Sequence, residues 1–179
     1  MEWEYLFPCL KHFGFSNPFI NWVKILYQDS ESCVLSNGFM SSFFKITRSV
    51  RQGDPLAAYL YVLQAEPLAC SIRKKSKIKG IELPIVDNKK IEVRLSMFAD
   101  DAELFHSTVE SIKEGFSVLQ MYSRASGAKI NVQKTKALKL GRWKSKKVDI
   151  DGISWSTHTQ GLGATMVNMI PILYGKIKF

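Results

Sequence analysis

The sequence predicts an α+β fold in which a small, mostly antiparallel sheet is backed by helices. Helices are predicted because the pairs Asn17-Pro18 and Asp54-Pro55 each precede apolar residues at spacings of three and four. A sheet is predicted because apolar and polar residues alternate over residues 91–97, as they do in a half-buried strand. A chain of 179 residues can bury one core and needs no second domain.

The first predicted helix runs from Pro18 to about Gln28, with Asn17 as its cap. Its core-facing residues are predicted to be Phe19, Trp22, Val23 and Leu26. The second helix begins after Asp54-Pro55 and runs to about Lys75, with a kink or a restart at Pro67.

The third predicted helix begins at a capping box formed by Ser107 and Glu110 and ends at Gly127. Its apolar residues recur at helical spacing: Val109, Ile112, Phe116, Leu119 and Tyr122.

Residues 32–35 and 43–48 are rich in β-forming residues, and the loop Ser36-Asn37-Gly38 between them predicts a hairpin with a longish loop. The strand over 91–97 follows a turn at Asp87-Asn88. Apolar residues resume at Ala102, Leu104 and Phe105, so Asp100 and Asp101 are predicted to lie at a strand-to-strand turn. Beyond Gly141 only short apolar pieces remain, around 148–155 and 166–173.

The composition is that of a globular, basic protein. Hydrophobic residues make up 46% and charged residues 23%, which excludes the polar composition of disordered chains. The net charge of +9 attracts polyanions such as nucleic acid. A basic run has two interpretations, a solvated helix end or a binding surface, of which the first is the more frequent: Arg73, Lys74, Lys75, Lys77 and Lys79.

Cysteine usage and apolar runs bear on location. Cys9, Cys33 and Cys70 are odd in number and far apart, so we predict no disulfide framework, no zinc site and a reducing compartment. No apolar run approaches the ~18 residues that span a membrane, and Glu2 and Glu4 stand where a signal peptide is basic. We therefore expect an intracellular protein, nuclear or cytoplasmic, with no membrane partner and no disulfide-linked partner.

The aspartate doublet is a candidate metal site. Asp100 and Asp101 are flanked by apolar residues, and adjacent carboxylates in such surroundings are unfavourable unless a cation offsets them. Mg²⁺ commonly binds one or two carboxylates together with substrate phosphates. The alternative is that both aspartates face water at an ordinary turn, and the pair alone does not decide between the two.

Two further segments carry candidate groups for a nucleotide. Arg51-Gln52-Gly53-Asp54 places a glycine, which permits close backbone approach, just before a helix N-terminus that favours phosphate. The alternative is a turn glycine followed by a cap. Residues 127–136 combine a helix stop with the cations Lys129, Lys134 and Lys136, and the alternative there is a solvated loop.

In this order the segments resemble the reverse transcriptase domain of LINE-type, non-LTR retrotransposons. Four elements carry the resemblance: Arg51 to Leu56 with the family's Arg-Gln-Gly-x-Pro-Leu, Glu66-Pro67-Leu68-Ala69 with the continuation of its helix, Phe98 to Asp101 with its aromatic-Ala-Asp-Asp turn, and Lys129-Ile130-Asn131 with Lys134. The resemblance extends over Trp3 to Gly38, where Leu10 to Tyr27 is similar to a helical stretch, and reaches Leu162-Gly163.

The resemblance implies part of a right-hand polymerase palm, with residues 1–141 as an incomplete palm and 142–179 as a truncated palm-to-thumb region. It implies RNA-directed DNA polymerase activity on an RNA template, a DNA primer and dNTP. In that chemistry, two Mg²⁺ (or Mn²⁺) ions held by palm aspartates align the primer 3′-hydroxyl with the dNTP α-phosphate.

The resemblance also implies roles for individual residues. Asp100 would be the main metal ligand and Asp101 its partner. Lys134 would protonate or steady pyrophosphate, which makes these three the catalytic candidates. The implied nucleotide or template contacts are Gln52 and Gly53, with Phe98 packed beneath the site near the primer end and Arg51 as a weaker phosphate contact.

Two departures from the family lower the expected activity. The family's first catalytic aspartate would fall a few residues before Met1, and residues 161–164 have glycine where the family has an aromatic residue before Leu-Gly. We therefore expect little or no polymerase activity from this chain alone, and an unpaired sheet edge or a hollow where the preceding strand would lie. The alternatives are a non-catalytic, basic RNA- or DNA-binding remnant of a retrotransposon and an unselected gene fragment.

Overall fold

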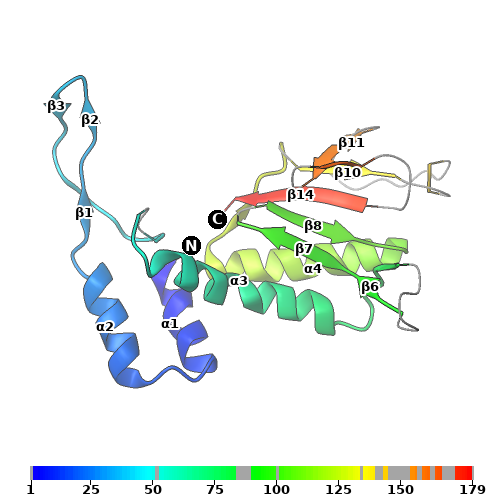
Figure 1. Ribbon diagram of the computed structural model, residues 1–179, viewed down its shortest axis with the longest axis horizontal. Helices are drawn as coiled ribbons and strands as arrows, with labels where there is room; N and C mark the ends of the chain where they lie inside the picture. Colours follow the sequence, from blue (N-terminus) through cyan, green and yellow to red (C-terminus); the bar gives the residue numbers. More distant parts are fainter. Residues whose placement is uncertain are drawn as a thin grey trace. The chain divides into compact units, whose positions relative to one another are not determined.

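The computed structural model describes residues 2–50, 53–83, 90–99, 101–133, 135–139, 143–144, 154–156, 159–161, 164–166 and 172–178. The fold is α+β, as predicted, and it divides into two compact units, Met1–Pro67 and Leu68–Phe179 (Figure 1). Each unit is described by itself.

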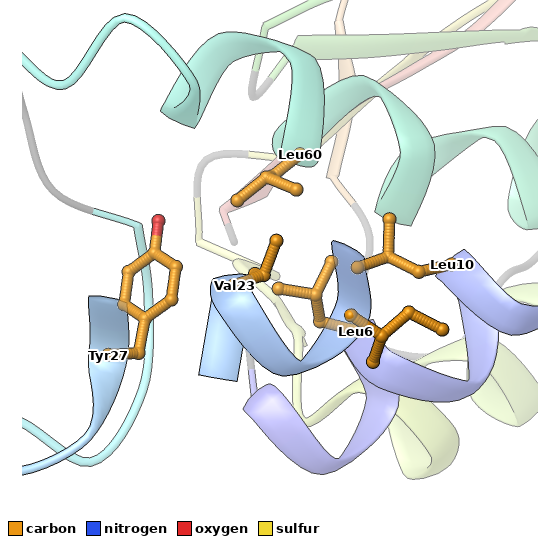
Figure 2. Packing of buried hydrophobic residues seen from close by; sticks show 6 residues of the cluster. Leu6, Leu10, Val23, Tyr27 and Leu60 are labelled. Carbon is orange, nitrogen blue, oxygen red and sulfur yellow. The ribbon is translucent and has the colours of Figure 1, made fainter. Parts of the chain in front are cut away.

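The first unit is built on three helical segments, α1 (Trp3–His12), α2 (Asn17–Tyr27) and the first half of α3 (Ala57–Lys74). Their apolar side chains meet in one cluster, in which Leu60 of α3 points toward the side chains of α1 and α2 (Figure 2). The buried members are Leu6, Leu10, Ile20, Val23, Tyr27 and Leu60. Burial of this cluster holds the N-terminal helices to the start of α3.

The stretch from Leu10 to Tyr27 is not one helix, because α1 ends at His12 and Gly14 adopts a left-handed φ of 83° before α2 begins. The cap of α2 is Ser16, so the predicted capping role of Asn17 is wrong. Pro18 lies in the first turn, as predicted, because that position needs no amide donor.

The predicted core face of α2 is right for Val23, which is buried, and for Phe19, which packs against the cluster, and wrong for Trp22 and Leu26. Ile20, Val23 and Tyr27 are buried, whereas Trp22 exposes 67% and Leu26 53% of their surface. Almost every position of this helix is apolar, so spacing alone leaves several faces equally hydrophobic. Contact with Trp3, whose ring centroid lies 5.3 Å from that of Tyr27, selects the face that is buried.

The predicted hairpin after α2 is present, with a tighter turn than expected. Strand β1 (Glu31–Ser32) pairs with β4 (Phe44–Lys45), and β2 (Leu35–Ser36) pairs with β3 (Phe39–Met40), all antiparallel. Only Asn37 and Gly38 connect the inner pair, and both have positive φ, as a two-residue hairpin turn requires. This arm extends away from α2 in Figure 1.

Helix α3 runs without a break from Ala57 to Lys74, so Pro67 does not restart it. The boundary between the two compact units nevertheless falls directly after this proline.

The second unit is centred on a mostly antiparallel sheet with the strand order β11-β10-β14-β8-β7. Its strands are β7 (Leu95–Phe98), β8 (Asp101–Phe105), β10 (Lys136–Leu138), β11 (Ser154–Ser156) and β14 (Ile172–Lys178), and β9 (Lys129–Ile130) pairs with the end of β14. The pair β10 and β11 is parallel. A short antiparallel pair, β12 (Thr159–Gly161) with β13 (Ala164–Met166), lies outside this sheet.

Strand β14 occupies the centre of the sheet, between β10 and β8. It pairs antiparallel with β8 along the whole of that strand, from Ile172 opposite Phe105 to Lys176 opposite Asp101. Strand β8 is thus paired on both sides, while β7 is the edge strand of the sheet in the described part of the chain. The expected unpaired edge or hollow at the place of the preceding strand stays a prediction. The sequence pattern was too weak beyond Gly141 to predict β14.

The predicted strand over 91–97 is divided at Arg94. Strand β6 (Glu92–Val93) pairs with β5 (Ile81–Glu82), while β7 pairs with β8. At the break the Arg94 carbonyl accepts a hydrogen bond from Phe105 N, and its guanidinium donates to Arg73 O at 2.7 Å. The predicted turn at Asp87-Asn88 lies outside the described part of the chain.

Helix α4 (Val109–Ser126) runs along one side of the sheet (Figure 1). It ends at Gly127, whose φ of 69° is left-handed, as predicted. Its cap is Thr108 and not Ser107, because the Thr108 side chain accepts a hydrogen bond from Ser111 N at 3.1 Å. The predicted apolar residues Ile112, Leu119 and Tyr122 are buried.

Across the described residues, no helix combines the length and the apolar character that crossing a membrane requires. Within the described residues, Cys9, Cys33 and Cys70 form no disulfide.

Candidate metal centre

The aspartate doublet lies at a tight turn between β7 and β8. The register pairs Phe98 with Asp101, so only Ala99 and Asp100 separate the paired ends. Ala99 has a φ of 49°, in the left-handed region that such short turns use. The predicted strand-to-strand turn is therefore confirmed. Asp100 itself is not among the described residues, and its role as a metal ligand stays a prediction.

Asp101 is the first residue of β8 and is half-buried. Phe98, directly across from it, exposes 72% of its surface. Its predicted position beneath the site, near the primer end, stays a prediction, and so does its predicted contact with a nucleic acid.

A second carboxylate on β8 was not anticipated. Glu103 is 1% exposed, and its Oε1 atom has no hydrogen-bond partner in the described part of the chain. Burial, and then the charge of nearby Asp101, raise the pKa of the Glu103 carboxyl above its ordinary value. Such a group is costly in a folded protein, since a buried polar atom normally has a partner.

Asp101 and Glu103 lie on the same face of the strand, because side chains two residues apart in a β-strand point the same way. The intervening Ala102 and the following Leu104 lie on the other face, where they are 0% and 2% exposed. Ser96 of β7 is the residue directly across from Glu103. The hairpin thus places two carboxylates side by side along one strand face.

The sequence signal that bears on Glu103 is the alternation of side chains between the two faces of β8. In the sequence, Ala102, Leu104 and Phe105 mark the return of apolar residues, and a charged residue between them is compatible with a solvated outer face. Residues on both faces of this strand are buried, and β7 and β14 pair with its two edges. Burial of Glu103 was therefore a matter of tertiary structure.

Within the described residues, no group of three or more His, Cys, Asp or Glu side chains is arranged to hold a metal ion. Asp100 is not among these residues. Asp101 and Glu103 nevertheless supply carboxylate oxygens, the donor type that Mg²⁺ and Mn²⁺ prefer.

The Gly53 turn lies in the first unit. Gly53 has a φ of 87° with open space around its Cα, so its conformation, not crowding, favours glycine there. Asp54 Oδ1 accepts a hydrogen bond from Leu56 N at 2.8 Å, which confirms its predicted capping role at the start of α3. Arg51 and Gln52 are not among the residues that the structure describes. Because Asp101 belongs to the other unit, a pocket shared by the turn and the doublet stays a prediction.

The lysine-bearing segment after α4 forms a turn between β9 and β10. Thr135 Oγ1 donates to Asn131 O at 2.8 Å and so closes the turn. Lys129 and Lys136 are exposed on either side of it. Lys134 is not described, so its predicted catalytic role is untested.

The basic run at the end of α3 is partly engaged within the protein. Lys75 Nζ lies 2.6 Å and Lys77 Nζ 3.5 Å from the Glu114 carboxylate on α4. The hydrogen bond from Lys75 is the main cause that lowers the pKa of the Glu114 carboxyl. These two lysines therefore have a structural partner and are not simply a solvated helix end or an open binding surface.

Comparison with known proteins identifies relatives over most of the chain. Residues 1–165 match the family model described as reverse transcriptase (RNA-dependent DNA polymerase). The chain is also 32% identical over 162 residues to a Xenopus laevis protein described as the transposon TX1 uncharacterized 149 kDa protein. That alignment covers 88% of this chain and 12% of the relative, so the chain spans a small part of its length.

Proposed function

Because the chain belongs to the reverse transcriptase (RNA-dependent DNA polymerase) family, in its LINE-type branch, we propose that it is the palm-centred part of an enzyme that copies RNA into DNA. The observation that carries this proposal is the β7–β8 hairpin, which holds the aspartate doublet at its tip. The proposal concerns this segment, since the chain spans only 12% of its transposon relative.

The residues at the hairpin fit a divalent cation. Reverse transcriptases generally use divalent metal ions, and Asp100 and Asp101 are the residues that would hold them here. The fit is supported by Glu103, whose buried Oε1 has no hydrogen-bond partner among the described residues and so leaves acceptor capacity on this strand face. When bound, such an ion supplies charge stabilisation at the attacking and leaving oxygens of phosphoryl transfer.

The other candidate residues would contact the nucleotide or the nucleic acid. Gly53, with Gln52 and Arg51 before it, would present backbone and cationic groups to the nucleotide or template near the start of α3. Phe98 would offer an exposed aromatic ring near the primer end, a surface on which bases stack. Lys134 would steady the departing pyrophosphate.

The proposal is tested by measuring Mn²⁺ affinity of the 179-residue chain and of Asp101→Asn. We expect the variant to bind Mn²⁺ at least about tenfold more weakly, as losses at metal sites typically reach 10–100-fold. Asp29→Asn is the matched control, because Asp29 is 78% exposed and makes only a 3.9 Å contact with Lys45. Unchanged affinity in Asp101→Asn would contradict the metal role.

Primer extension on an RNA template tests the activity itself. We expect little or no extension from this chain alone with Mg²⁺ or Mn²⁺. Robust extension that is abolished by Asp100→Ala would show that expectation to be wrong and would establish a working polymerase.

A second candidate function is non-catalytic nucleic-acid binding, favoured by the net charge of +9. It predicts salt-sensitive RNA or DNA affinity together with Mn²⁺ affinity that is indifferent to Asp101. The Asp101→Asn measurement therefore separates the two functions.

A further inference from the structure

Glu103 is a buried acidic residue in the second unit that the sequence did not predict as part of the site. Its side chain is 1% exposed, and its Oε1 finds no hydrogen-bond partner within the described residues. A carboxylate in that position is strongly unfavourable unless a cation or a donor accompanies it.

Three cations of the second unit have other carboxylates as partners. Arg94 contacts the Glu92 carboxylate at 2.7 Å, and Lys75 and Lys77 contact Glu114. In the part of the chain that the structure describes, no Lys, Arg or His forms an ion pair with Glu103. The protein therefore supplies no described countercharge for this carboxylate.

The neighbour on the same strand face is Asp101, two residues earlier on β8. Residues at this spacing have Cα atoms ~7 Å apart, since a strand rises ~3.3–3.4 Å per residue. Asp and Glu side chains from such positions can converge on one cation, or each can hold one ion of a pair ~3.5–4 Å apart. Two carboxylates on one strand face, one of them buried, are a ligand arrangement that suits a divalent cation, because such cations bind oxygen donors.

We propose that Glu103 is a further carboxylate ligand of the divalent cation at the β7–β8 turn, acting beside Asp101 from the same face of β8. The proposal rests on the proposed function, because it takes the doublet as the metal-binding end of the hairpin. One ligand of the cation would then be a buried residue within β8, two positions beyond the turn.

Mn²⁺ titration of the 179-residue chain and three variants tests this proposal. Glu103→Gln keeps the shape and removes the charge, Glu103→Asp shortens the reach by one methylene, and Glu82→Gln is an exposed glutamate of the same unit as a control. We expect affinity at least about tenfold weaker in Glu103→Gln, intermediate in Glu103→Asp and unchanged in Glu82→Gln.

Two measurements keep the test independent of folding defects. Metal-free Glu103→Gln is expected to have a Tm at or above that of the parent chain, because a neutral amide is less costly to bury than a carboxylate. In the unsubstituted chain, substoichiometric Mn²⁺ is expected to broaden the backbone amide NMR signals of Ala102 to Leu104 before those of α4.

The outcomes distinguish this inference from the proposed function. If Asp101→Asn weakens Mn²⁺ binding while Glu103→Gln does not, Glu103 is only a buried acid and the inference is overturned, but the doublet keeps its role. If the unsubstituted chain binds no Mn²⁺, both fail. Weakened binding in both variants supports both.

Discussion

At the residue scale, a buried histidine is held by one serine. His106 is 2% exposed, and its Nδ1 lies 2.8 Å from Ser111 Oγ. That hydroxyl donates to Lys79 O and accepts from Lys79 N, both at 2.9 Å, so the histidine proton is placed on Nδ1. Gly115 allows this arrangement, because a Cβ there would meet His106 Cε1 at 2.6 Å.

Burial of His106 predicts a loss of stability in mild acid. Burial lowers the pKa of His106 from 6.5 to about 4. Between pH 6.5 and pH 4 the unfolded chain takes up a proton that the folded chain does not. The contribution of neutral His106 to the free energy of unfolding is therefore fully present above pH 6.5 and is lost as the pH falls to 4. The loss of stability is expected to reach about 3 kcal/mol, since a pKa difference of one between the folded and unfolded chain corresponds to about 1.36 kcal/mol.

Urea unfolding at several pH values measures this loss against two variants. His106→Asn keeps a donor near the Nδ1 position and removes the titration, so its stability should vary less between pH 6.5 and 4. His12→Asn removes an exposed histidine and should follow the parent chain. Parallel curves for the parent chain and His106→Asn would contradict the prediction.

Glu103 shows at the same scale how one residue changes the description of a site. Motif and spacing predict the doublet at the turn, whereas the carboxyl two residues later is distinguished only by its burial and by an oxygen that has no hydrogen-bond partner among the described residues. A charged residue within a strand is compatible with a solvated face until both faces are known to be covered.

At the element scale, the start of α4 differs from the sequence prediction by one residue. Ser107 and Thr108 are both acceptable caps, and the Ser107 to Glu110 spacing suggested the first. The structure uses Thr108, because Ser107 lies before the turn and its Oγ reaches Lys79 O at 3.4 Å instead.

This difference predicts unequal costs for two neighbouring substitutions. Thr108→Ala removes the acceptor for Ser111 N and should destabilise the protein by about 1 kcal/mol, the usual cost of losing a cap. Ser107→Ala removes only a long, exposed hydrogen bond and should change stability by less than ~0.5 kcal/mol. Thermal unfolding of the two variants measures both costs. A larger loss of stability in Ser107→Ala than in Thr108→Ala would show that Ser107 is the cap of α4.

At the scale of the whole molecule, net charge alone does not say where a polyanion binds. Of the basic residues near α3 and β9, Lys75 and Lys77 are engaged with Glu114, whereas Lys129 and Lys136 are exposed beside the turn that follows α4. Lys129 and Lys136 are therefore the better candidates for phosphate contacts.

Two double variants with the same charge change test this assignment. Lys129→Gln with Lys136→Gln should weaken binding of single-stranded RNA more than Lys75→Gln with Lys77→Gln. It should also lower the dependence of affinity on salt, which changes by roughly 0.7 per phosphate neutralised on single strands. Fluorescence anisotropy across a series of NaCl concentrations measures both quantities. Equal effects of the two pairs would show that the overall charge decides binding.

The sequence by itself determined the α+β class, the starts of α2 and α3, the end of α4, the turn that carries the doublet, and the family. These features depend on residues within a few positions of one another, through proline placement, capping, left-handed glycine and alternation. Local patterns of this kind are legible without knowledge of the rest of the chain.

Only the tertiary structure decided which face of α2 is buried, that β14 lies between β10 and β8, and that Glu103 lies inside the sheet. Each depends on a partner distant in sequence: Trp3 and Leu60 for Val23 and Tyr27, and a strand some seventy residues downstream for Glu103. Burial and pairing arise from such long-range contacts, and local periodicity carries no information about them.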